Sequence, residues 1–169
     1  LNVLGLLLAS KEALKHFDGT GGSIINISSG ASTLTPANTS VYSATKAAQA
    51  AFAESLRSEC AGTGVHVSAV FPVSTTTEFR EAMERDFGHQ VSGLGPKQPV
   101  EHVARAIVEC LRTPAAEVYP HRASRGLPIL NAIAPAFTDR LMRKYGRRRV
   151  VAPAPTDSTQ SRAHGRARE

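Results

Sequence analysis

The sequence predicts a three-layer α/β fold in which helices cover a parallel sheet. Short, mostly apolar runs at residues 23–28, 65–71 and 116–120 have the composition of strands buried in such a sheet. A long alanine-rich helical pattern lies between the first two runs, and an amphipathic helical pattern lies between the second and the third. Alternating strands and helices are the signature of a parallel sheet with right-handed crossovers.

Boundary signals delimit the predicted helices. The first helix covers residues 1–17 and ends at the glycine-rich segment 18–22. The long helix runs from about residue 41 to residue 61, and Gly62-Thr63-Gly64 closes it. A third helix, over about 99–112, precedes the last short strand.

The net charge of +6 is concentrated at the end of the chain. Residues 147–169 hold six arginines against two acidic residues and are rich in Pro, Ala, Ser and Thr. This composition cannot bury enough apolar surface to fold, so we expect a basic, disordered tail. Because the rest of the chain is nearly neutral and no aromatic residues alternate with the arginines, we expect no nucleic-acid binding.

Neither metal binding nor membrane insertion is expected from the composition. The two cysteines, Cys60 and Cys110, fall on predicted helices and are interpreted as buried free thiols. The histidines have no ligand-like spacing, so no metal site is predicted. The apolar run from Val3 to Ala9 is far too short to cross a bilayer.

The strongest functional signal is a tyrosine and a lysine four residues apart, Tyr42 and Lys46. Positions i and i+4 of a helix share one face, so the phenol and the ammonium can point into the same cleft. A free tyrosine has a pKa of roughly 10, and a nearby cation favours the phenolate. Ser29, at the end of the first strand, can hydrogen-bond a carbonyl or alcohol oxygen beside the phenol. These groups suit proton transfer to or from a C–O group.

The sequence around these residues resembles the active-site half of the short-chain dehydrogenase/reductase family. The resemblance rests on GGSIINISSGAS at 21–32, VYSATKAA at 41–48, NVLG at 2–5 and GVHVSAVFP at 64–72, and it covers residues 1 to about 120. It implies a Rossmann-like, doubly wound parallel sheet. It also implies an oxidoreductase that moves a hydride between NAD or NADP and an alcohol or carbonyl substrate.

The resemblance assigns a role to each site residue. Tyr42 is the general acid/base, and Ser29 orients and polarises the reacting oxygen. Lys46 favours the phenolate and holds the cofactor ribose, while Asn2 supports a water in the proton relay. The residues implied in cofactor binding are Tyr42, Lys46, Pro72, Val73 and Thr77.

The segment after the second strand is expected to border the cofactor. In this family the stretch that corresponds to residues 73–98 covers substrate and nicotinamide as a mobile lid. The alternative is that its short helix, at about 78–87, simply packs on the domain. Val73 stands where the family usually has Gly. A valine restricts φ and adds bulk near the nicotinamide, so we expect a reshaped pocket and altered turnover.

The family's phosphate-binding turn has no counterpart in this sequence, which begins with Leu rather than Met. A dinucleotide needs backbone N–H groups at a helix N-terminus to hold its pyrophosphate. We therefore interpret residues 1–146 as the carboxyl-terminal part of a Rossmann-type domain whose dinucleotide-binding strands are missing here. The alternative is a non-catalytic, truncated relative or dimerisation module that cannot bind cofactor.

Residues 127–146 form one more helical segment, in which apolar side chains recur at helical spacing. Pro135 must kink this segment or restart it as a second helix. We expect it to pack on its own domain or to border the substrate pocket. The alternatives are a contact with a partner subunit or with an anionic membrane surface. The family implies a small-molecule substrate, a homo-oligomer and a cytoplasmic location, with peripheral membrane association as the alternative.

Overall fold

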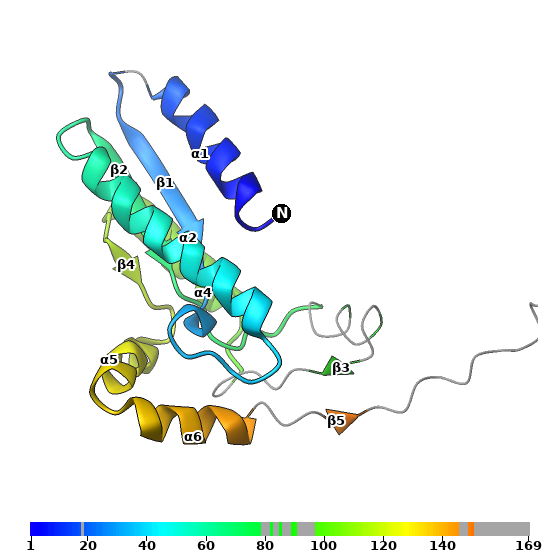
Figure 1. Cartoon of the computed structure of the whole chain (residues 1–169). Coiled ribbons are helices and arrows are strands. Elements are labelled where there is room, and N and C mark those ends of the chain that lie inside the picture. The colour runs from blue at the N-terminus through cyan, green and yellow to red at the C-terminus, as the bar shows by residue number, and fades with distance from the viewer. Residues whose placement is uncertain are drawn as a thin grey trace, which may run out of the picture.

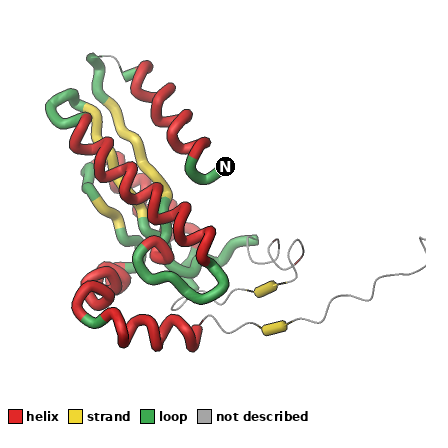
Figure 2. The backbone as a smooth tube through the Cα atoms, in the orientation of Figure 1, coloured by secondary structure: helices red, strands yellow, loops and turns green. Residues whose placement is uncertain are grey.

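The structure is a computed structural model that describes residues 1–17, 19–78, 82, 85, 89–90, 97–145 and 149–150. The predicted lid helix at 78–87 therefore lies largely outside the described residues. So does most of the predicted basic tail. Figures 1 and 2 show a small sheet with helices packed along it and a pair of helices at one end.

The centre of the fold is a parallel sheet with the strand order β1-β2-β4. β1 (Gly22–Ile27) pairs with β2 (Val65–Val70) along its whole length, so that Ile27 lies opposite Val70. β4 (Glu117–Val118) pairs with the end of β2. The α/β class and the parallel pairing predicted from the sequence are confirmed.

Helices cover both faces of this sheet. α1 (Leu4–His16) and α2 (Ser40–Glu59) lie on one face, and α4 (Val100–Arg112) lies on the other, behind the sheet in Figure 1. Alternate residues of β2 make these contacts. Val67 and Ala69 belong to the core under α2, whereas the hydroxyl of Ser68 accepts a hydrogen bond from the thiol of Cys110 in α4 at 3.3 Å.

The two crossovers have opposite hands. The strand order advances in one direction from β1 through β2 to β4, yet the connecting helices α2 and α4 lie on opposite faces. Two right-handed crossovers in the same direction would place both helices on one face. The expectation of right-handed crossovers is therefore wrong for one of the two.

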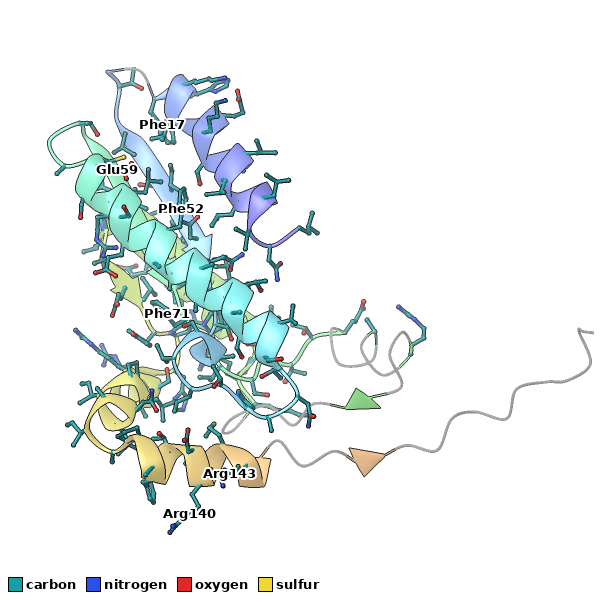
Figure 3. The ribbon with its side chains drawn as sticks, in the orientation of Figure 1. Phe17, Phe52, Glu59, Phe71, Arg140 and Arg143 are labelled. Carbon is teal, nitrogen blue, oxygen red and sulfur yellow. The ribbon has the colours of Figure 1, made fainter. Side chains whose placement is uncertain are left out.

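An apolar core joins α2 to the sheet. α2 is rich in alanine, which favours a helix and lets it approach the strands closely. The core consists of Ile24, Ala53, Leu56, Cys60, Val67, Ala69 and Phe71. Phe17 and Phe52, labelled in Figure 3, pack against it from the side of α1 and α2. Cys60 and Cys110 are buried free thiols, as predicted.

Short elements complete the described fold. A 3-10 turn, η1 (Gly30–Ser32), follows β1, and a second, η2 (Arg122–Arg125), follows β4. α5 (Gly126–Ile133) ends before Pro135, which is the first residue of α6 (Pro135–Tyr145), so the predicted restart of the helix is confirmed. β3 (His89–Gln90) and β5 (Arg149–Val150) form a two-residue antiparallel pair.

Two glycines bring β1 and β2 together where their pairing begins. Gly21 has a φ of 70° and Gly64 a φ of 78°, values that favour glycine. The N–H of Gly22 donates to the carbonyl oxygen of Gly64 at 3.2 Å. A Cβ atom on Gly21 would lie 2.7 Å from that same oxygen, which is too close for real atoms.

The variant Gly21→Ala should destabilise the fold more than Gly19→Ala. Both positions have positive φ, so each alanine costs about 1–2 kcal/mol in backbone strain. Gly19 has open space around it, so it serves as the matched control. Because Gly21→Ala also forces β1 and β2 apart, we expect an additional loss of about 1 kcal/mol or more in denaturant unfolding. Equal losses for the two variants would contradict this account.

Candidate active site

Ser29 stands just beyond the carboxyl end of β1, as the sequence predicts. Its backbone is extended, with φ −166° and ψ 155°, and it precedes the turn η1. Its Oγ accepts a hydrogen bond from the N–H of Ala31 at 3.1 Å, and its carbonyl oxygen accepts from the hydroxyl of Ser32 at 2.7 Å. These contacts fix the side chain at the end of the sheet where parallel α/β folds bind ligands.

Tyr42 and Lys46 lie on one face of the first turns of α2. The ammonium nitrogen of Lys46 is 5.9 Å from the centre of the Tyr42 ring. Both side chains are half-buried. The hydroxyl of Thr45 donates to the carbonyl oxygen of Tyr42 at 2.8 Å, which supports the helix at this point. The structure therefore brings the phenol and the cation together, as the i, i+4 spacing predicts.

Hydrogen bonds in both directions tie Lys46 to the end of β1. Its Nζ donates to the carbonyl oxygen of Ile27 at 2.8 Å and to Oε1 of Gln49 at 2.9 Å. The carbonyl oxygen of Lys46 accepts from the hydroxyl of Ser28 at 2.7 Å. Burial removes the ammonium partly from water and lowers the pKa of Lys46 below its usual value of 10.5.

Asn2, in the segment that precedes α1, is bonded to the residues of α2 that surround Lys46. Its side-chain amide donates to the hydroxyl of Thr45 at 3.1 Å. Its carbonyl oxygen accepts from Nε2 of Gln49 at 2.7 Å. Asn2 is thus held twice against α2, and Gln49 connects it to Lys46. The structure brings the predicted residues Asn2, Tyr42 and Lys46 into one cluster next to the strand that leads to Ser29.

The residues after β2 lie beside the turn that follows Ser29. The carbonyl oxygen of Pro72 accepts from the N–H of Gly30 at 2.9 Å. A methyl carbon of Val73 lies 3.4 Å from the point where a Cβ on Gly30 would stand. Pro72 and Val73 therefore lie against the turn that follows Ser29. Thr77, farther along the same segment, is exposed.

Several polar residues that hold these segments in place were not predicted from the sequence. Gln49 is one. Gln98, buried at the start of the α4 region, donates through its side chain to the hydroxyl of Thr75 at 3.3 Å. Asn131 of α5 donates to the carbonyl oxygen of Thr33, in the loop after Ser29, at 3.2 Å. A polar residue three positions after Lys46 on the same helix face was the one available signal for Gln49.

The described residues contain no cluster of three or more potential ligands that could hold a metal ion. Within the same part of the chain, no helix is long and apolar enough to span a membrane.

Similar proteins are found among both sequences and solved structures. The short chain dehydrogenase family model matches residues 1–87. An uncharacterized oxidoreductase of Methylorubrum extorquens is 45% identical over 78 residues, which are 46% of this chain and 31% of that protein. Carbonyl reductase family member 4 of Danio rerio is 31% identical over 113 residues, which are 67% of this chain and 48% of that protein.

One similar solved structure is a short chain dehydrogenase from Burkholderia cenocepacia in complex with NADP. It has a TM-score of 0.67 and 28% sequence identity, and the match covers 83% of this chain and 55% of that one. The match confirms the predicted Rossmann-like fold. The chain spans roughly half the length, or less, of the proteins named here.

The lowered pKa of Lys46 predicts how stability depends on pH. When a lysine has a lower pKa in the folded state, the unfolded chain binds more protons, so stability rises with pH through the folded pKa up to the unfolded value near 10.5. We therefore expect the unfolding free energy of the wild type to rise relative to that of Lys46→Met over this alkaline range. The exposed Lys15→Met variant measures the effect of losing a surface lysine. If the unfolding free energy of the wild type fell relative to that of Lys46→Met as the pH rose, the expected direction would be wrong.

Proposed function

Because the chain belongs to the short-chain dehydrogenase family, we propose that it carries the catalytic residues of an NAD(P)-dependent oxidoreductase acting on an alcohol or carbonyl compound. The observation that carries this proposal is the position of the Tyr42–Lys46 pair. The Lys46 ammonium is bonded to the last residue of β1, two positions before Ser29, and stands 5.9 Å from the Tyr42 ring. A proton-transfer group, a cation and a hydroxyl donor are thereby gathered at the carboxyl end of the sheet.

Each of these residues has a definite task in alcohol oxidation. The phenolate of Tyr42 accepts the alcohol proton while the carbon–hydrogen bond breaks, and in carbonyl reduction the phenol returns it. Ser29 uses a lone pair to accept from Ala31, so its O–H can donate to the substrate oxygen. The Lys46 ammonium supplies a positive charge beside the Tyr42 ring. The Asn2 carbonyl has a second lone pair, which suits the water expected in the proton relay.

The residues present fit the ribose and nicotinamide half of a dinucleotide. NAD or NADP, when bound, supplies the acceptor or donor of the hydride. An ammonium has three N–H donors, and Lys46 uses two of them on Ile27 and Gln49. The third can hold a ribose hydroxyl. Pro72 and Val73 border the same end of the sheet through their contacts with Gly30. The NADP complex of the similar Burkholderia protein supports this proposal.

The helical segment at 127–146 is proposed to border the substrate side of the site. Asn131 of α5 is bonded to the loop that follows Ser29, at the carbonyl oxygen of Thr33. The hydroxyl of Thr138, which is fully buried, donates to the side-chain oxygen of Asn131 at 2.6 Å and so fixes the amide. α5 and α6 are thereby attached to the loop that positions the catalytic serine.

Association of the chain into a homo-oligomer is a further part of the proposal. Three leucines of α1 are exposed in the chain, namely Leu4, Leu7 and Leu8. Exposed apolar side chains on one helix favour burial against further protein. Two further features are proposed from the sequence alone. They are the lid at 73–98 and the basic tail at 147–169.

Replacement of Tyr42 by Phe in the full-length enzyme should lower kcat by at least about 10²-fold, because it removes the acid/base hydroxyl and adds no bulk. Tyr119→Phe is the matched control. Tyr119 stacks on Phe71 and donates to Glu117 and is not one of the residues bonded around Lys46, so this variant should retain the wild-type kcat. Normal turnover by Tyr42→Phe would refute the assignment. A wild type inactive with both dinucleotides would favour the non-catalytic alternative.

Replacement of Asn131 by Ala should raise the KM for the substrate with a smaller effect on kcat. The variant removes the hydrogen bond that holds the loop at Thr33. The loss of one hydrogen bond of about 1 kcal/mol corresponds to a several-fold rise in KM. Ile133→Ala, an exposed position on the same helix, is the control and should leave KM unchanged. Identical KM values for both variants and the wild type would show that α5 does not border the substrate side of the site.

A further inference from the structure

Gln49 is a polar residue in a place where a helix normally carries an apolar side chain. It lies on the buried face of α2, one turn before Ala53 in the core, and only 7% of it is exposed. A buried amide is costly unless its donors and acceptor are bonded. Here both ends are used, because Oε1 accepts from Lys46 and Nε2 donates to the carbonyl oxygen of Asn2. The chemistry of these two partners fixes the amide in one orientation.

The contacts of Gln49 determine the direction of the Lys46 ammonium. Ile27 offers one acceptor from β1 at 2.8 Å, and Gln49 offers a second from α2 at 2.9 Å. Two fixed acceptors leave a rotating ammonium with a single direction for its third N–H. Without Gln49, Ile27 alone would hold the ammonium, which could then turn about that one bond.

Resting on the proposed function, we propose that Gln49 is a positioning residue for the reaction, whose amide aims the Lys46 ammonium and ties it to the main chain of Asn2. An amide neither gains nor loses a proton near neutral pH. Gln49 therefore acts on the reaction through its partners Lys46 and Asn2 and takes no part in proton transfer itself.

The surroundings of Lys46 make this role measurable. From β1 the ammonium meets a main-chain oxygen, that of Ile27, and Gln49 links it to the segment before α1. On its own helix it faces Gln49 and the ring of Tyr42. The described contacts of Nζ are therefore with two neutral oxygens and with the Tyr42 ring. A change at residue 49 is therefore expected to appear directly in the titration of Lys46.

Two variants of Gln49 separate positioning from packing. Gln49→Leu keeps a similar volume and removes both hydrogen bonds. Gln49→Glu keeps an acceptor for Lys46 but, when ionised, cannot donate to Asn2. Leu56→Met, a volume-conserving change in the core of the same helix, is the matched control. In the full-length enzyme we expect Gln49→Leu to lower kcat about 10-fold or more with little change in KM, because a catalytic group is misplaced.

The pH profile of kcat/KM is expected to shift in a different direction in each Gln49 variant. Loss of an acceptor disfavours the charged lysine, so the alkaline limb of kcat/KM should move to lower pH in Gln49→Leu. A carboxylate favours the charge, so the limb should move to higher pH in Gln49→Glu. Leu56→Met should keep the wild-type profile. A loss of kcat in Gln49→Leu without movement of this limb would indicate a packing role and overturn the inference.

An NMR titration of ¹³Cε-labelled lysine tests the inference without any activity. The Lys46→Met variant identifies the signal of Lys46 in the full-length protein. We expect its midpoint to fall in Gln49→Leu and to rise in Gln49→Glu, and equal midpoints in all three proteins would overturn the inference. If Gln49→Leu does not fold, the shift in Gln49→Glu decides alone. If the wild type has no dinucleotide-dependent activity, the proposed function fails, and this titration still decides the role of Gln49.

Discussion

The hydrogen bond from the Lys46 ammonium to the carbonyl oxygen of Ile27 is the interaction on which the site depends. It joins the first turns of α2 to the end of β1, and the Ser28 hydroxyl reinforces it by donating back to the carbonyl of Lys46. Ser29 follows these two residues directly. Lys46 therefore joins the strand that presents the serine to the helix that presents the tyrosine through contacts at both its ends.

This arrangement holds a partly buried cation between two neutral acceptors. Burial lowers the pKa of Lys46, which by itself favours the neutral amine. The two oxygen acceptors oppose that tendency, because they stabilise the ammonium where water has been removed. Neither acceptor carries a charge. A carboxylate in their place would neutralise the field that the ammonium exerts on the Tyr42 ring, whereas two neutral oxygens leave that field in place.

The sequence predicted what depends on local spacing. Strand and helix alternation gave the parallel sheet, and the spacing of Tyr42 and Lys46 placed both on one face of α2. Pro135 marked the start of α6 because it lacks the N–H that a continuing helix needs. The contact of Gln49 with Asn2 joins residues far apart in the sequence and arises only when α1 and α2 pack together. The hand of the crossovers likewise depends on which sheet face each helix covers, and no local pattern specifies it.

The division of α2 into two halves explains how such a polar site stays ordered. In its second half, Ala53 and Leu56 are buried against the strands and anchor the helix by apolar packing. In its first half the inward positions carry Lys46 and Gln49, whose hydrogen bonds are directional and would be weak in water. Because both halves belong to one continuous helix, the packed half fixes the position and tilt of the polar half. The polar contacts then need only to orient side chains, since the core already holds the backbone that carries them.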